Sequence, residues 1–231
     1  LTLVLPRREP SPVADLAAAG LSTLAIRVPS HPLARALLMA FGHPIVAPSA
    51  NRSGHVSPTT AQHVADDFAD LPLTILDGGA VDGGLESTIV RVTDGRVMLL
   101  RAGLVPRGDI EAVICMPVEI PTLADGERPD APGMLASHYA PHAAVRVDAS
   151  EPRPDEAFLA FGPMPAGPCK LSINLSQSGD LREAAANLFA ALRRLDRSGA
   201  ATIAVAPIPD SGLGEAINDR LRRAAAPRSD D

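Results

Sequence analysis

The stretch LREAAANLFAALRRLDR, residues 181–197, is the strongest structural signal in the sequence. Its apolar side chains return every three or four residues, which is the spacing of one face of an α-helix. These residues are Leu181, Ala184, Ala185, Leu188, Phe189, Leu192 and Leu195. Apolar runs at 157–161, 170–174 and 201–206 are typical of strands, and a second helical pattern covers 213–225. Strands that alternate with helices predict a small α/β layer in this part of the chain.

Short strands and helices also follow one another in the first half of the chain. Apolar and β-branched content predicts strands at 1–5, 23–28, 44–47, 73–76, 87–92 and 97–101. Helices are predicted at 31–41, with Ser30 as N-cap, and from the N-cap Ser57 to about residue 68. Asp94-Gly95, between the last two strands, is typical of a hairpin turn. For the C-terminal helix at 213–225, Asp210 or Ser211 is the candidate cap.

Residues 116–141 differ in composition from the regions on either side. They are rich in Pro, Gly and Asp and show no sustained periodicity, which predicts an interdomain linker. A stretch this long without secondary structure is either disordered or functional. We therefore expect two small domains, which suits a chain of 231 residues.

Composition and charge narrow the class of protein. Hydrophobic residues make up 46% of the chain and aromatic residues only 3%, so the cores should be aliphatic. The net charge of −6 argues against nonspecific wrapping of nucleic acid, although a local basic pocket could still bind a small anion. Two distant cysteines, no apolar run of membrane length and no signal segment indicate a cytoplasmic protein without a disulfide framework or a membrane partner.

Residues 46–64, VAPSANRSGHVSPTTAQHV, contain many hydroxyl and amide side chains and no acidic residue. Ser49 and Asn51 follow a predicted strand, and a predicted helix begins at Ser57. Helix N-termini attract anions through unpaired N–H groups and the helix dipole. The segment is therefore a candidate site for an anionic ligand. A capped turn, in which Gly54 takes a positive φ angle, explains the same pattern equally well.

Other candidate residues have both a structural and a functional interpretation. Arg27 and Arg101 lie in apolar strands, where a charge usually faces solvent, but both could bind a carboxylate or phosphate in a shared pocket. Tyr139, the single tyrosine, either makes a packing contact or anchors the linker on another surface. The glycine-rich segments at 77–90 and 212–214 match no nucleotide-binding motif well, so structural turns are favoured. No nucleophile–base pair is apparent, and any chemistry should rest on positioning and charge.

Five stretches taken together resemble a known family. They are PIVAPSANRSGHVSPTTAQHV, DGGAVDGGLESTIV, LLRAG, APGMLASHYAP and IPDSGLGEAINDRL, in this order. Over essentially its whole length the sequence resembles the two-domain YrdC-like threonylcarbamoyl-AMP synthases. The resemblance implies an α/β fold with a YrdC-like twisted mixed sheet and helices at 1–115, a linker at 116–143 and a small Rossmann-like α/β domain at 144–231.

The resemblance also implies an activity, that of a nucleotidyltransferase. Threonine and bicarbonate would form a carbamate, the carbamate would attack the α-phosphate of ATP, and pyrophosphate would leave. The product, threonylcarbamoyl-AMP, would pass to the machinery that modifies the adenosine next to the anticodon of certain tRNAs. Mg²⁺ is expected to arrive with ATP, without ligands from the protein.

Nine residues match positions that have roles in the family. For ATP they are Thr23, Ser49, Asn51, Ser57, Arg101 and Tyr139. For L-threonine they are Arg27, Ala47 and Ser87. The resemblance implies that the Arg27 guanidinium holds the threonine carboxylate and that Tyr139 closes over the ATP site. No residue is assigned a catalytic role.

One part of the family pattern has no counterpart in this sequence. The family carries a K-x-R motif and a threonine-pocket turn in its N-terminal segment, whereas this chain opens with Leu1 inside a predicted strand. We therefore expect that an N-terminal part of the catalytic domain is missing. Cationic side chains supply much of the catalysis in nucleotidyl transfer. The 231-residue chain is predicted to be inactive alone, while the full-length protein is the enzyme.

Two other hypotheses stay open. A YrdC-like module could bind a nucleotide or double-stranded RNA without catalysis, although the acidic balance of the chain counts against RNA. A carbamoyl transferase of the hydrogenase-maturation kind shares the catalytic fold, but such proteins carry zinc-finger segments and this chain has no cysteine clusters.

Overall fold

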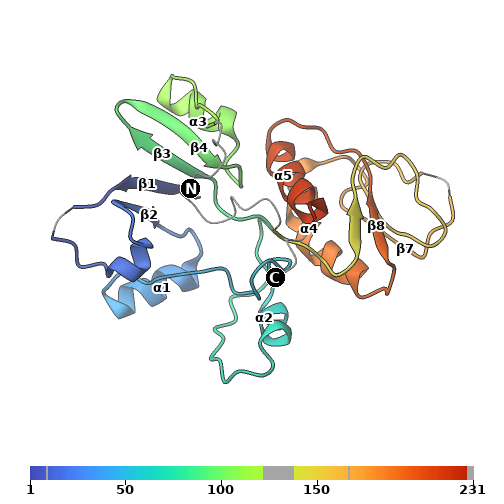
Figure 1. The fold of residues 1–231 in the computed structure, drawn as a ribbon, viewed down its shortest axis with the longest axis horizontal. Coiled ribbons are helices and arrows are strands. Elements are labelled where there is room, and N and C mark those ends of the chain that lie inside the picture. The colour runs from blue at the N-terminus through green and yellow to red at the C-terminus, as the bar shows by residue number, and fades with distance from the viewer. Residues whose placement is uncertain (9, 122–137, 166, 228–231) are drawn as a thin grey trace. The chain divides into compact units, whose positions relative to one another are not determined.

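The computed structural model describes residues 1–8, 10–121, 138–165 and 167–227 (Figure 1). The described chain divides into two compact units. The first unit holds residues 1–49 and 87–121, and the second holds 50–86 and 138–227. Segment 50–86, which lies before the predicted linker in the sequence, is thus grouped by its contacts with the C-terminal part of the chain. Most of the predicted linker falls outside the described residues.

The first unit is built on a mixed sheet of four strands in the order β2-β1-β3-β4 (Figure 1). β1 (Thr2–Pro6) pairs antiparallel with β2 (Thr23–Arg27) and parallel with β3 (Ile89–Thr93). β3 pairs antiparallel with β4 (Arg96–Arg101) through a hairpin. The turn residues Asp94 and Gly95 have φ angles of 49° and 72°, which confirms the predicted hairpin and its requirement for left-handed backbone.

Three helical segments belong to the first unit. They are the short 3₁₀ helix η1 (Asp15–Ala18), α1 (Pro32–Phe41) and α3 (Arg107–Ile114). α3 covers the β3–β4 hairpin, where Ile110 packs in a core with Val90, Val97, Leu99 and Val118. The sequence pattern did not predict α3, because a helix of 8 residues is too short to show a sustained period.

The second unit contains a fully parallel sheet of four strands in the order β5-β8-β6-β7. The strands are β5 (Ala144–Arg146), β6 (Ala157–Ala160), β7 (Leu171–Asn174) and β8 (Thr202–Val205). Two long helices accompany them, α4 (Leu181–Asp196) between β7 and β8, and α5 (Leu213–Ala225) after β8. This arrangement confirms the predicted Rossmann-like α/β domain.

α4 owes its position to the apolar stripe from which the fold was predicted. Ala184, Ala185, Leu188, Leu192 and Leu195 are all completely buried. The Asp180 side chain begins the helix, because its carboxylate accepts hydrogen bonds from the N–H groups of Arg182 and Glu183. Arginines lie in the last turn of the helix, on its polar side.

Several local predictions were wrong. Residues 44–47 and 73–76 are exposed and form no strand, because short apolar runs carry no information on a partner strand. α1 begins after His31 without a side-chain cap, so Ser30 is not its N-cap, and Gly212 stands where Asp210 or Ser211 was predicted to cap α5. α2 (Ala61–Asp67) begins later than predicted, and its N-cap is Thr60.

Candidate functional site

Six of the nine predicted site residues lie in the first unit, and three of these are exposed. Arg27 is the last residue of β2, and its guanidinium has no hydrogen-bond or ion-pair partner among the described residues. Ala47 and Ser49 lie in the irregular segment that follows α1, and Thr23 is the first residue of β2. The first unit therefore presents one uncommitted guanidinium at a strand end, which suits a ligand carboxylate.

Ser87 and Arg101 are joined directly. The Arg101 Nη2 and Nε groups donate to the Ser87 carbonyl oxygen at 2.8 and 3.2 Å. The Ser87 hydroxyl lies 2.7 Å from the Thr2 hydroxyl on the neighbouring strand. Arg101 is thus neither a plain surface charge nor an uncommitted cation, because it fixes the peptide that leads into β3. Two residues predicted to bind different substrates share one hydrogen-bond network.

Ser57, in the second unit, is not a helix cap. Its hydroxyl donates to Glu86 Oε1 at 2.8 Å and is buried. Glu86 Oε2 accepts from both Nε and Nη2 of Arg220, each at 3.0 Å. The predicted capping role was therefore wrong, because a carboxylate 29 positions away in the sequence binds the hydroxyl. The predicted contact of Ser57 with ATP stays a prediction.

Arg220, on α5, is a completely buried cation that sequence reasoning did not identify. Its Nη1 donates to Asp219 at 2.8 Å, in addition to the two bonds to Glu86. Burial opposes the charge, but the neighbouring Glu86 carboxylate, with Tyr139 and Asp219, raises the pKa of Arg220 overall. Arg220 therefore stays charged in the interior of this unit. A helical pattern in the sequence gives no sign that one of its arginines faces inward.

Tyr139 is packed in the same cluster. Only 1% of the residue is exposed, and its ring stacks on Phe189 of α4 with the ring centroids 5.5 Å apart. The Arg220 guanidinium lies 5.3 Å from the centre of the Tyr139 ring. The next residue, Ala140, donates its N–H to the Gly54 carbonyl at 2.9 Å. The structure thus shows Tyr139 as an anchor for the end of the predicted linker, and its predicted closure over ATP stays a prediction.

Asn51 has an acceptor that the described protein does not use. Its Nδ2 donates to the carbonyls of Arg52 and His55 at 2.8 and 3.1 Å, which fixes the orientation of the amide. Its Oδ1 is buried and has no hydrogen-bond partner among the described residues. A buried acceptor without a partner costs free energy, so it marks a place where a ligand or water donor would stabilise the protein.

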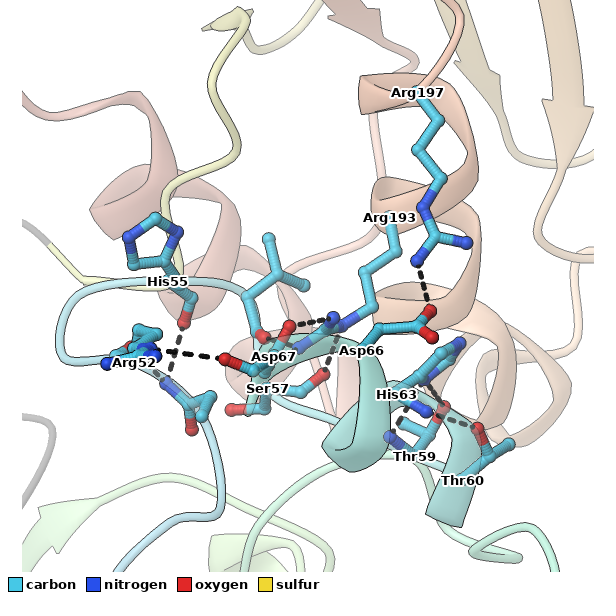
Figure 2. Close-up of polar contacts among 12 residues, drawn as sticks. Arg52, His55, Ser57, Thr59, Thr60, His63, Asp66, Asp67, Arg193 and Arg197 are labelled. Atoms are coloured by element: carbon cyan, nitrogen blue, oxygen red, sulfur yellow. Dashed lines mark hydrogen bonds and ion pairs between the residues drawn. The ribbon is translucent and has the colours of Figure 1, made fainter. Parts of the chain in front are cut away.

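Figure 2 shows the polar contacts between α2 and the last turns of α4. Arg193 grips the Asp67 carboxylate with both terminal nitrogens, at 2.8 and 2.6 Å. The same guanidinium donates to the carbonyls of Val56 and Ser57. One turn later Arg197 pairs with Asp66 at 2.6 Å. α4 therefore holds both α2 and the loop that leads to it.

The His63 ring accepts a hydrogen bond at this contact. The Thr59 N–H donates to His63 Nδ1 at 3.2 Å, which requires that this nitrogen carry no hydrogen. Burial lowers the pKa of His63, with Arg193 and Arg197 adding to the effect and Asp66 and Asp67 opposing it. The structure therefore favours the neutral imidazole.

Acidification should destabilise the protein through His63. Because the folded pKa lies below the ordinary value of about 6.5, the unfolded chain takes up the proton first, so this contribution is complete above that value and declines as the pH falls through it. We expect the midpoint of urea unfolding to fall less between pH 8 and pH 5.5 in His63→Gln than in the unaltered protein. Equal pH dependence in the two proteins would refute the assignment.

Within the described ranges, no three His, Cys, Asp or Glu side chains gather closely enough to hold a metal ion. None of the helices in the part of the chain that the structure covers is long and apolar enough to cross a membrane.

The fold and these residues define the class of protein. It combines a mixed-sheet α/β unit, which has an uncommitted arginine at a strand end, with a second α/β unit whose sheet is parallel. The family model described as "Telomere recombination" matches residues 1–103. The model described as "Threonylcarbamoyl-AMP synthase, C-terminal domain" matches residues 105–226. The chain belongs to the threonylcarbamoyl-AMP synthase family.

Individual relatives agree with the family models. Threonylcarbamoyl-AMP synthases of Pyrococcus abyssi and Bacillus subtilis are 38% and 37% identical over 99% of this chain. The chain spans 71% and 70% of those proteins, and 63% of a relative from Schizosaccharomyces pombe that is 32% identical.

Solved structures agree as well. A crystal structure of P. abyssi Sua5 complexed with L-threonine is 36% identical and matches with a TM-score of 0.85, covering 97% of this chain and 69% of that one. A variant of the same protein, with a histidine and the following tyrosine replaced by alanine, matches at 0.83.

Proposed function

We propose that the protein makes threonylcarbamoyl-AMP and pyrophosphate from L-threonine, bicarbonate and ATP. The observation that carries the proposal is the similarity over 99% of the chain to relatives named for this activity, at 38% and 37% identity. The threonine amine and bicarbonate form a carbamate with loss of water. A carbamate oxygen then bonds to the α-phosphorus of ATP, and the bond to pyrophosphate breaks.

In this proposal Arg27 binds the carboxylate of threonine. Its guanidinium is exposed at the end of β2 and is not committed to another described residue. A planar guanidinium binds a carboxylate through two parallel hydrogen bonds, which fixes the orientation of the amino acid as well as its charge. Ala47 and Ser87, of the same unit, are proposed to line the threonine site.

For ATP, the proposal assigns Asn51 and Ser57 the clearest roles in the second unit. The unused Oδ1 of Asn51 can accept from an N–H or O–H donor, and ATP offers both in its adenine amino group and ribose hydroxyls. The Ser57 hydroxyl is already oriented by Glu86. Tyr139 is proposed to contact the nucleotide, and Thr23, Ser49 and Arg101 are the corresponding proposals in the first unit.

Magnesium is proposed to come with the triphosphate. Mg²⁺ is usually held by substrate phosphates and water with only one or two carboxylates. The residues that the structure describes offer no three-ligand cage, and a metal held by ATP needs none. Its charge would help to neutralise the departing pyrophosphate. We further propose that the product is passed to a tRNA-modifying enzyme, and that the protein works in the cytoplasm.

The test is pyrophosphate release by the protein at the full length of its gene, with mass spectrometry of the product. Release should require threonine, bicarbonate, ATP and Mg²⁺ together. Arg27→Ala should raise the KM for threonine by about 10- to 100-fold, the loss of a charged hydrogen-bonded pair, and should leave the KM for ATP nearly unchanged.

Two variants control this experiment. Arg27→Lys keeps the charge but loses the two-pronged geometry, so its KM for threonine should lie between those of the unaltered protein and Arg27→Ala. Arg35→Ala removes another exposed charge, from α1, and should change neither KM. Pyrophosphate release that does not depend on threonine would overturn the proposed function.

A further inference from the structure

Ser57 is held from two sides by the two helices of the C-terminal α/β domain. On one side its carbonyl oxygen accepts from Arg193 Nε of α4 at 3.3 Å. On the other side its hydroxyl donates to Glu86, whose second oxygen is bound by Arg220 of α5. Every one of these residues lies in the second unit. The backbone and the side chain of a single serine are thus fixed separately.

Arg193 binds the loop that contains Ser57 and also joins α4 to α2. Its side chain is 9% exposed, and the guanidinium binds Asp67 with two nitrogens, Ser57 O with Nε and Val56 O with Nη2. A planar group with five donors in a fixed fork can bind both carboxylate oxygens and two carbonyls at once, whereas the three donors of a lysine cannot supply these four bonds. Figure 2 shows Arg193 reaching from α4 toward Ser57 and Asp67.

Arg197 supplies an internal comparison. It caps the C-terminal end of α4, four residues after Arg193, and binds Asp66, the neighbour of Asp67, so the two arginines make parallel ion pairs with the same helix (Figure 2). The Arg197 side chain is 63% exposed, and among the described residues it bonds to Asp66 and not to the loop carbonyls. If replacing either arginine changes the KM for ATP, the change comes from packing between the helices. If replacing Arg193 alone changes it, the change comes from the contacts of Arg193 with the loop.

We propose that Arg193 is a positioning residue for ATP, through which the C-terminal domain sets the place of Ser57 in the nucleotide site. The inference rests on the proposed function, because it takes Ser57 as a contact of ATP. It gives the C-terminal domain a part in the reaction without requiring a ligand site of its own. Arg193 contacts the loop carbonyls and Asp67, and it acts on the nucleotide only through Ser57.

The experiment is a double-mutant cycle on pyrophosphate release by the protein at the full length of its gene. Ser57→Ala should raise the KM for ATP by about 3- to 10-fold, a single hydrogen bond. Arg193→Ala should raise it by a similar factor, because it leaves Ser57 present but displaced. The double variant should have about the same KM for ATP as either single variant, because the second substitution removes a contact that the first has already lost. The KM for threonine should not change.

Arg197→Ala is the matched control and should leave the KM for ATP unchanged. All variants are assayed at a temperature where circular dichroism shows them folded, and hydrogen exchange of residues 55–59 should be faster in Arg193→Ala than in Arg197→Ala. Where Arg193→Ala does not fold, Arg193→Lys carries the test, because it keeps a charge beside Asp67 and loses the bonds to the loop.

This experiment distinguishes failure of the inference from failure of the proposed function. Suppose that the unaltered protein releases pyrophosphate. If Arg193→Ala then has the same KM for ATP as Arg197→Ala, or if its effect on that KM adds independently to the effect of Ser57→Ala, the inference is overturned and the proposed function stands. If the unaltered protein releases none in the presence of all substrates, the proposed function fails and the inference fails with it.

Discussion

Arg220→Ala is expected to lower the free energy of unfolding by about 3–5 kcal/mol, the usual cost of removing one partner of a buried ion pair. The Arg220 side chain is completely buried and makes two hydrogen bonds to Glu86 and one to Asp219. Its removal leaves the 19%-exposed Glu86 carboxylate without its cation and opens a cavity beside Tyr139. Chemical denaturation followed by circular dichroism measures the change.

Arg222→Ala is the matched control for this prediction. Arg222 lies on the same helix and pairs with Asp210 at 3.0 Å, but both side chains are more than half exposed. Such a pair contributes about 0–1 kcal/mol. In a double-mutant cycle, adding Glu86→Gln to Arg220→Ala should cost less than Glu86→Gln costs in the unaltered protein, because the interaction between Glu86 and Arg220 is already absent. Equal losses in Arg220→Ala and Arg222→Ala would contradict the buried-pair assignment.

Gly84→Ala should destabilise the second unit by about 2–5 kcal/mol, the sum of left-handed strain and overpacking. Gly84 has a φ of +69°, and a Cβ at this position would lie 2.1 Å from the Ala185 carbonyl oxygen and 2.6 Å from the Ala186 Cα. Both are backbone atoms of α4, which cannot move away without shifting the helix. The absence of a side chain at Gly84 thus allows this segment to approach the helix closely.

Gly79→Ala separates the two causes. Gly79 lies in the same segment with a φ of +85°, but no atom lies within 4 Å of its hypothetical Cβ. Only the backbone strain remains, so the loss should be about 1 kcal/mol. If Gly84→Ala unfolds at the same denaturant concentration as Gly79→Ala, the close packing of residue 84 on α4 is refuted.

The sequence predicted best the elements with a long or sharply punctuated pattern. α5 spans Leu213–Ala225 as predicted, and α4 ends one residue earlier than expected. The β3–β4 hairpin was identified from Asp94-Gly95. The failures are short: 44–47, 73–76 and α3. A run of four apolar residues does not say whether a neighbouring strand exists to pair with it.

The candidate site was predictable only in part, for a related reason. Ser57 and Asn51 stand in a recognisable stretch of the sequence, whereas their surroundings come from elsewhere in the chain. Arg193 is separated by 126 positions from Asp67, and Arg220 by 134 positions from Glu86. Both arginines belong to helices that contain other arginines, so no local pattern distinguishes them. Which carboxylate pairs with which arginine is therefore decided by the tertiary structure.

By itself, the sequence determined the α/β class, the long helices of the C-terminal domain and the family, because period, turn chemistry and motif are properties of neighbouring residues. Only the tertiary structure decided that Ser57 binds Glu86 instead of capping a helix, and that Arg193 and Arg220 hold its loop. A serine hydroxyl can donate to a nearby carboxylate or accept from a helix N–H, and the choice depends on which partner the packing of α4 and α5 brings within 3 Å.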